Sequence, residues 1–275
     1  MLWEQEVGVQ IPHPRRVLPL TEGGSTRDSL PVMKPVDAVV ERPVVFFHVM
    51  KCAGSSVREG LTMGLAGYRD GPEVFELDGN AAKTAAGGTV SGDLAFRDVL
   101  LPYVVATQHP AVVLGHFRYR DYHAPLMEAA HLTTVLRDPV ERLVSLHAYR
   151  RHQPGVVLPV SRDLREQIAS KQWNHEGHRY VSTFCGRDDL DPYSEEAIAT
   201  AVANLRRFAV VGSVERLDDF AARVSALVGA PIAFPVLNTR PALAVTETDP
   251  EFMAVMRDLC AADIAVYEQV TGFAS

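Results

Sequence analysis

Two short segments of the sequence carry side chains that can hold an anion. In the first, Lys51 and Gly54 stand immediately before two hydroxyl residues, Ser55 and Ser56, at the expected start of a helix. Unpaired backbone N–H groups at a helix start favour negative charge, and a glycine lets the backbone approach a ligand closely. Lys51 adds a mobile positive charge. The spacing therefore predicts a cradle for an anion such as phosphate.

The same segment has a purely structural interpretation as well. Ser56 and Glu59 have the spacing of a capping box, in which both side chains satisfy N–H groups at the helix start and bind no ligand. A Walker A loop reads Gly-x-x-x-x-Gly-Lys-Ser/Thr, with its lysine after the second glycine. Here Lys51 precedes Gly54, so the segment is not a Walker A loop, whereas the capping box stays open.

The second segment follows the apolar run 131–136 and places Arg137 at the expected strand end. Asp138 stands at the N-cap position of the next helix, and Ser145 lies about two helical turns after Arg137. The planar donor fork of an arginine, with a hydroxyl on the same helix, can hold a phosphate. In the alternative interpretation, Arg137 only forms an ion pair with Asp138 or Glu141.

A histidine is the candidate proton acceptor. His116 follows the apolar run 111–115, and ligands of α/β proteins bind at the carboxyl ends of the strands. An imidazole titrates near neutral pH, so His116 can serve as a general base. His48, just before the first loop, is the rival base. For either residue the alternative is a structural histidine whose hydrogen bonds are satisfied within the fold.

The elements that must position these residues follow from the hydrophobic pattern. Short runs rich in β-branched and aromatic residues predict buried parallel strands at 44–49, 111–115, 131–136 and 208–212. Helical patterns lie between and after them, at about 92–106, 139–152, 161–171, 176–185, 194–207 and 216–229, with one long helix from 250 to 271. This alternation predicts an α/β three-layer sandwich with a mostly parallel central sheet flanked by helices.

Composition limits the class of protein. The 275 residues carry a net charge of −7 and are 47% hydrophobic, which argues against disorder and against a general nucleic-acid binder. The three cysteines lie far apart, without the spacing of a zinc site or a disulfide framework. No apolar run is long enough for a membrane span, and no secretory signal is recognisable. We expect a cytoplasmic protein without metal, nucleic-acid or membrane partners, in which 44–275 form one domain and the proline-rich 1–43 an arm or lid.

The two anion segments together resemble the sulfotransferases. The order is a strand, Lys-x-x-Gly-Ser-Ser and a helix, then a strand, Arg-Asp-Pro-x-Glu-Arg-x-x-Ser and a helix. It is most similar to the branch that holds the heparan sulfate 2-O-sulfotransferases and bacterial members. Weaker similarities are found in Leu114–Phe117, Tyr180–Gly186, Val210–Phe220 and Leu237–Arg240, so the resemblance extends from about 44 to 270.

The resemblance implies a P-loop-like fold and a donor, 3′-phosphoadenosine 5′-phosphosulfate (PAPS), that becomes 3′-phosphoadenosine 5′-phosphate. By position, Arg137 and Ser145 would hold the 3′-phosphate, and His116 would be the base. Lys51 would neutralise charge on the leaving phosphate. The residues that would line the 5′ end are Lys51, Ala53, Gly54, Ser55 and Ser56. The reaction would need no metal.

The first loop departs from the family pattern Pro-Lys-Thr, because it reads Met50-Lys51-Cys52. Loss of the proline should loosen the loop, and Cys52 replaces a hydroxyl that could contact phosphate. A thiol beside Lys51 at an anion site could also have a lowered pKa. The departure leaves a non-catalytic nucleotide-binding protein as one alternative function. A P-loop-like nucleotide kinase is a second alternative, which the missing Walker A loop and the lack of a clear Mg²⁺-binding aspartate disfavour.

The acceptor is expected to be a hydroxyl of a carbohydrate or small metabolite, and a homo-oligomer stays open. Several arginines could line a pocket for an anionic acceptor, or could equally belong to a solvated face: Arg118, Arg120, Arg150 and Arg151.

Overall fold

The structure is a computed structural model, and the residues it describes are 42–66, 74–88, 90–151, 163–171, 173–237 and 249–272. The chain divides into two units, Met1–Lys34 and Pro35–Ser275, and all the described residues belong to the second. The expected arm or lid at 1–43 therefore lies outside the described residues, apart from Arg42 and Pro43.

The centre of the fold is a five-stranded parallel sheet with the order β2-β3-β1-β4-β5. Its strands are β1 (Val44–Phe47), β2 (Val74–Glu76), β3 (Val112–Gly115), β4 (His131–Leu136) and β5 (Val210–Ser213). Four of them confirm predicted strands, although β5 begins two residues later than expected. The edge strand β2 was not predicted, because its three residues are partly exposed and form no apolar run.

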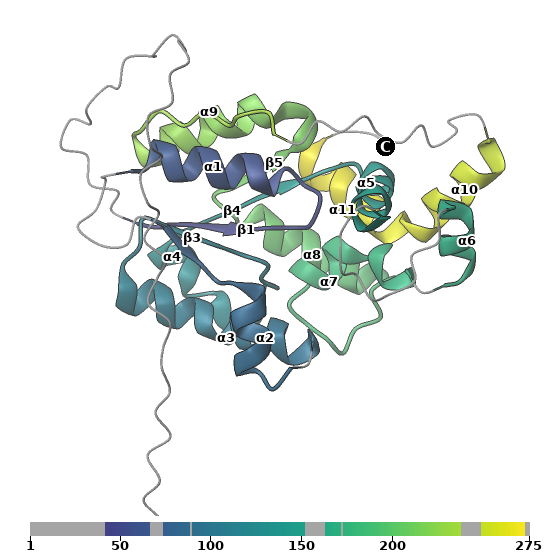
Figure 1. The fold of residues 1–275 in the computed structure, drawn as a ribbon, viewed down its shortest axis with the longest axis horizontal. Coiled ribbons are helices and arrows are strands. Elements are labelled where there is room, and N and C mark those ends of the chain that lie inside the picture. The colour runs from purple at the N-terminus through teal and green to yellow at the C-terminus, as the bar shows by residue number, and fades with distance from the viewer. Residues whose placement is uncertain are drawn as a thin grey trace, which may run out of the picture. The chain divides into compact units, whose positions relative to one another are not determined.

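Helices cover both faces of the sheet, which confirms the predicted three-layer α/β fold (Figure 1). They are α1 (Gly54–Gly64), α2 (Gly79–Ala85), α3 (Val90–Gln108), α4 (Leu126–Ala129), α5 (Pro139–Arg151), α6 (Leu164–Ala169), α7 (Arg179–Phe184), α8 (Glu195–Arg206), α9 (Leu217–Val228), α10 (Pro250–Leu259) and α11 (Ala261–Thr271). None of the described helices combines the length and apolar character that a membrane span requires.

The two faces of β1 pack into separate cores. Val44 and Phe46 belong to one apolar cluster with residues of α1 and α9. Val45 and Phe47 belong to another, with residues of α3, α7, α8 and α11. Both faces are therefore buried, which explains why the strand reads as a continuous apolar run rather than as an alternating one.

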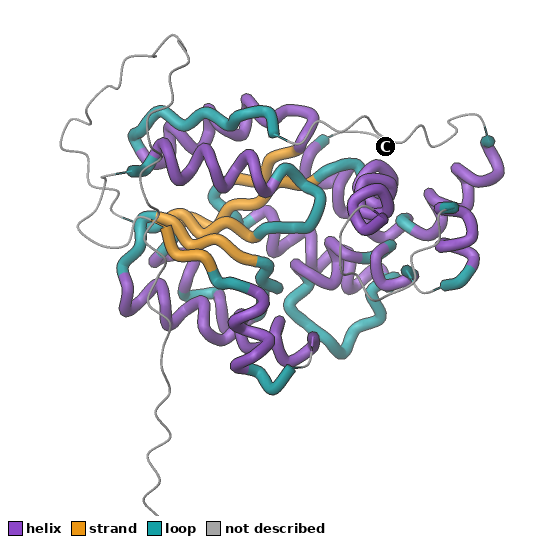
Figure 2. Tube along the Cα trace, viewed as in Figure 1, coloured by secondary structure: helices purple, strands orange, loops and turns teal. Residues whose placement is uncertain are grey.

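The parallel register brings the carboxyl ends of the strands to one edge of the sheet. Phe47 at the end of β1 pairs with Gly115 at the end of β3, and Phe46 pairs with Thr133 of β4. Figure 2 shows the strands ending toward the same side, where the chain passes into loops. The segments that follow β1, β3 and β4 therefore leave the sheet side by side.

The C-terminal region differs from the expected single helix over 250–271. Asp249 caps α10 through the N–H groups of Glu251 and Phe252, but this helix ends at Leu259, and after the single cap residue Cys260 the next helix, α11, starts. The break separates two packing environments, since Met256 of α10 packs with α5 and α6, whereas Val266 of α11 packs in the sheet-side core.

Candidate functional site

The first loop, between β1 and α1, has an unusual backbone. Lys51 has a φ of 72° and Ala53 a φ of 55°, both in the left-handed region that residues other than glycine rarely adopt. Such conformations cost free energy and concentrate at functional sites. Ala53 is the N-cap residue of α1 and makes no side-chain cap bond. The N–H groups at the start of α1 are therefore not capped by their own N-cap side chain.

The capping box considered for Ser56 and Glu59 does not form, because α1 already begins at Gly54. Ser56 is buried, and its Oγ accepts a hydrogen bond from the N–H of Leu237 at 3.3 Å. Ser55 is exposed at the helix start. Of the two hydroxyls expected to contact an anion, Ser55 thus faces solvent, whereas Ser56 holds a neighbouring segment. That segment was expected to extend over Leu237–Arg240, and its last three residues lie outside the described part of the chain.

Gly54 is required by a close contact with the His48 side chain. A Cβ atom at position 54 would lie 1.8 Å from His48 Nε2, far inside van der Waals contact. The imidazole of His48 therefore occupies the space beside the start of α1 that a side chain at position 54 would need. The predicted approach of a ligand to Gly54 stays a prediction.

Cys52 anchors the loop in the core. Its side chain is fully buried, and Sγ lies 3.6 Å from the hydroxyl oxygen of Tyr180. Burial raises the pKa of this thiol to about 11, although the nearby Arg142 opposes the shift. The thiol points into the core and is not exposed at the anion site, so the structure does not favour the lowered pKa that the sequence left open.

The second loop joins β4 to α5. Asp138 Oδ1 accepts a hydrogen bond from the N–H of Glu141 at 2.9 Å, which confirms the predicted cap. Arg137 donates through Nε and Nη2 to Glu141 Oε2 at 3.2 and 3.0 Å. The alternative ion pair between Arg137 and Glu141 is therefore present. Ser145 lies half-buried two turns further along α5.

The two loops meet at one buried hydroxyl group, that of Tyr180 on α7. This hydroxyl donates to the carbonyl oxygen of Arg137 at 2.5 Å and accepts from the N–H of the same residue at 3.0 Å. The Cys52 sulfur lies beside the same oxygen. The backbones that carry Lys51 and Arg137 are thus held next to each other.

Lys51 also contacts α5 directly. Its Nζ lies 4.4 Å from the ring centroid of Tyr149, and Tyr149 follows Ser145 by one helical turn. Residues four apart lie on the same side of a helix, so the ammonium group is next to the face that carries Ser145. Lys51, Ser145 and Arg137 accordingly border the same helix.

His116 and His48 form a stacked pair beside the first loop. Their ring centroids are 4.2 Å apart with an interplanar angle of 24°. His116 Nδ1 lies 2.7 Å from the His48 carbonyl oxygen. A carbonyl only accepts, so Nδ1 carries the proton, and Nε2 of the neutral ring keeps its lone pair.

Both histidines have lowered pKa values. Burial, with the positive charges of His116 and Lys51, lowers the pKa of His48 to about 3. Burial also lowers the pKa of His116, while the hydrogen bond to the His48 carbonyl works against this. His48 thus stays neutral at physiological pH and is a weak base. His116 as the proton acceptor stays a prediction, which the low pKa of His48 supports.

Three of the four arginines considered for an acceptor pocket are engaged in ion pairs, and the fourth, Arg151, is exposed at the end of α5. Arg118 and Arg120 both contact Asp98, a fully buried carboxylate, and Arg120 also contacts Asp188 at 2.8 Å. Arg150 pairs with the buried Glu176 at 3.0 Å. These contacts favour structural roles for the three side chains.

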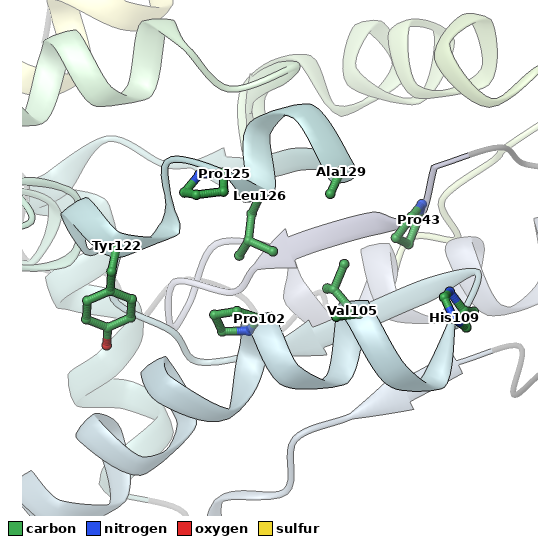
Figure 3. Close-up of a pocket in the computed structure, with 9 residues that line it drawn as sticks. Pro43, Pro102, Val105, His109, Tyr122, Pro125, Leu126 and Ala129 are labelled. Atoms are coloured by element: carbon green, nitrogen blue, oxygen red, sulfur yellow. The ribbon is translucent and has the colours of Figure 1, made fainter.

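A cavity of about 440 Å³ lies elsewhere, between α3 and α4. Figure 3 shows Leu126 of α4 facing Pro102 and Val105 of α3, with Pro43 nearby. Pro43 immediately precedes β1, so the cavity reaches the edge where the strands begin. It contains none of the predicted site residues, which belong to the opposite edge.

Two tyrosines of the site were not singled out from the sequence as site residues. Tyr149 could have been found from its spacing of four residues after Ser145 on one helix. Tyr180 stands in a segment that resembled the sulfotransferases, but no local pattern shows that its hydroxyl reaches Arg137.

Neither the family models nor the curated proteins with which the sequence was compared match this chain. Among the described residues, no group of three or more His, Cys, Asp or Glu side chains is arranged to hold a metal ion.

Proposed function

We propose that this protein is a PAPS-dependent sulfotransferase, which moves a sulfuryl group to a hydroxyl of a carbohydrate or small metabolite. One observation carries the proposal: the loops holding Lys51 and Arg137 meet at the Tyr180 hydroxyl, at the carboxyl edge of the sheet. PAPS carries its 3′-phosphate and its 5′-phosphosulfate on one ribose, so it needs two adjacent anion sites. The adjacency of the two loops supports the proposal.

Each loop has a distinct task in this proposal. The N–H groups at the start of α1 and the exposed Ser55 hold the 5′-phosphate. Lys51 neutralises negative charge that develops on the leaving phosphate, and Tyr149 orients its ammonium group. Arg137 and Ser145 hold the 3′-phosphate. To bind the phosphate, the Arg137 guanidinium must give up its ion pair with Glu141 or contact both groups. Breaking an exposed ion pair of this kind costs less than about 1 kcal/mol.

His116 removes the proton from the acceptor hydroxyl. Its Nε2 carries the lone pair, because Nδ1 donates to the His48 carbonyl. The lowered pKa keeps the ring neutral near pH 7, as a general base requires. The proposal includes a cytoplasmic location, which the three buried, unpaired cysteines favour.

A thermal-shift experiment tests the donor site. The desulfated product, 3′-phosphoadenosine 5′-phosphate, should raise the Tm without magnesium, since ligand at 100 times its Kd stabilises the folded state by about 2.7 kcal/mol. An equal response to ATP with magnesium would instead support a nucleotide kinase. No response to the bisphosphate would contradict the proposal.

A turnover experiment then separates an enzyme from a nucleotide-binding protein. PAPS is incubated with a panel of carbohydrates and hydroxylated metabolites, and the bisphosphate product is measured. Acceptor-dependent product that disappears in Lys51→Ala supports the transferase. Tight binding of the bisphosphate without turnover of any acceptor would favour the non-catalytic alternative.

A further inference from the structure

The tyrosine that joins the two loops is unusually constrained. Tyr180 is fully buried, and both hydrogen-bonding functions of its hydroxyl are used by the backbone of Arg137. Cys52, from the other loop, lies against the same oxygen. The Tyr180 hydroxyl therefore contacts two segments that are far apart in the sequence and adjacent in the site.

The backbone and ring of Tyr180 are held by residues outside the two loops. The N–H groups of Tyr180 and Val181 donate to Asp263 Oδ1 of α11 at 2.7 and 3.2 Å. The guanidinium carbon of Arg142 lies 5.7 Å from the centre of the Tyr180 ring. Since its main chain and its ring are both held, the position of the hydroxyl is set by the core rather than by the loops.

We infer that Tyr180 is a positioning residue that fixes the spacing between the loop of Lys51 and the loop of Arg137. This inference rests on the proposed function, because the spacing matters for a ligand that bridges both loops. Tyr180 does not touch the nucleotide. Its role is to let the two phosphates of one molecule bind at the same time.

The physical basis is the advantage of binding two linked groups at once. When one phosphate is bound, the second is presented to its site at a high effective concentration, provided that the distance between the sites matches the ligand. Pre-organised sites also avoid the entropy cost of ordering each loop on binding. Loosening the connection should therefore weaken a ligand with both phosphates and spare ligands with only one.

The test compares three nucleotides on Tyr180→Phe by isothermal titration calorimetry. Phenylalanine keeps the buried ring and removes only the hydroxyl. We expect the affinity for 3′-phosphoadenosine 5′-phosphate to fall about tenfold or more, while the affinities for adenosine 5′-monophosphate and adenosine 3′-monophosphate change less than about twofold. Equal losses for all three nucleotides would indicate a merely structural role and overturn the inference, as would unchanged affinity for the bisphosphate.

Tyr119→Phe is the matched control. Tyr119 is equally buried, and its hydroxyl accepts a hydrogen bond from Arg207 at 3.3 Å, away from both loops. This variant should bind the three nucleotides as the wild type does. A selective loss for the bisphosphate in Tyr119→Phe as well would show that any buried hydroxyl has the effect, and would overturn the special role of Tyr180.

A second measurement on the free protein does not depend on the proposed function. In Tyr180→Phe, the amide proton of Arg137 should exchange with solvent at least tenfold faster, and Cys52 should react faster with a thiol reagent, as followed by peptide mass spectrometry. Wild-type protein that binds none of the nucleotides would refute the proposed function, while these two rates would still decide whether Tyr180 holds the loops. Unchanged rates would overturn the inference.

Discussion

At the scale of single residues, the strongest constraint lies where His48 meets the start of α1. The imidazole occupies the space in which a side chain at position 54 would begin, and it stacks on His116. One neutral ring thus links the first loop to the candidate base. The fit explains why position 54 needs a glycine even though its backbone is ordinary helix.

Gly54→Ala should destabilise the protein by about 3 kcal/mol or more, because its Cβ would clash with the His48 ring. Chemical denaturation measures the free energy of unfolding. Gly79→Ala is the control, since a Cβ there meets nothing closer than Arg97 Nη1 at 3.8 Å, and it should change stability by less than about 1 kcal/mol. A mild effect of Gly54→Ala would contradict the close contact.

His116→Ala should lower turnover by about 10²–10⁴-fold, while binding of 3′-phosphoadenosine 5′-phosphate stays within twofold. In the wild type, burial holds the pKa of His116 below 6.5, so the base form persists on the acidic side of that value. The acidic limb of kcat/KM against pH should therefore have its midpoint below pH 6.5. An intact rate in His116→Ala would remove this residue as the base.

At the scale of elements, α5 organises the proposed 3′-phosphate site. The helix starts at Pro139 after the Asp138 cap, and its first exposed turn carries Glu141, which pairs with Arg137. An acidic side chain so close to a proposed phosphate site competes with the ligand for the guanidinium group. This competition can be measured.

Glu141→Gln should raise the affinity for 3′-phosphoadenosine 5′-phosphate by about two- to fivefold, because it releases Arg137 from an exposed ion pair. Arg137→Ala should lower that affinity about tenfold or more and leave adenosine 5′-monophosphate unaffected. Calorimetric titrations with both nucleotides provide the comparison. Normal binding of the bisphosphate by Arg137→Ala would refute the assignment of the second loop.

Most of the parallel sheet could be predicted, because strands buried on both faces read as short apolar runs. The cap of α5 was also readable, since Asp138 bonds a group three residues away. The edge strand Val74–Glu76 lacked such a run. The break at Cys260 could not be read locally, because it depends on which core each half of the terminal segment joins.

The candidate site was predictable as a set of residues but not as a set of contacts. We could group Lys51, His116 and Arg137 into one candidate site because each follows a predicted strand. The sequence left two roles open for Arg137: the structure shows the ion pair with Glu141, and the phosphate-binding role stays a prediction. The bridging role of Tyr180 arises from a contact between distant segments, which local patterns do not encode.

At the scale of the whole molecule, stability should depend on a buried carboxyl group. Burial raises the pKa of Asp263 to about 7, despite the opposing charge of Arg142 and two backbone N–H donors. Within the described residues, its Oδ2 has no hydrogen-bond partner. The folded protein therefore keeps a proton on this carboxyl at a pH where the unfolded chain, with a pKa near about 3.9, has lost it.

Because the folded-state pKa of Asp263 is raised, its contribution to stability is complete below about pH 4 and is lost as pH rises to 7. Asp263→Asn removes this titration. The free energy of unfolding of the variant minus that of the wild type should therefore increase by at least about 1 kcal/mol as the pH rises from 5 to 8. Urea denaturation at both pH values measures the change. A constant difference between variant and wild type would contradict the prediction.

Glu176→Gln is the control for this pH dependence. Burial acts against ionisation of Glu176, but hydrogen bonds from His175 and Arg179 and the charge of Arg142 lower its pKa. The contribution of Glu176 to the free energy of unfolding is therefore lost only in acid, below the pH range of the experiment. The difference between Glu176→Gln and wild type should stay constant from pH 5 to pH 8.

The strand order also governs how the chain can fold. β1 is synthesised first and lies at the centre of the sheet, yet its two partners begin only at Val112 and His131. At translation rates of about 5–20 residues per second, Val44 waits on the order of ten seconds for the second of them. Until β3 emerges, this intensely apolar strand has neither neighbour, and until β4 emerges it has only one, so the nascent chain should depend on chaperones that shield it until the sheet closes around it.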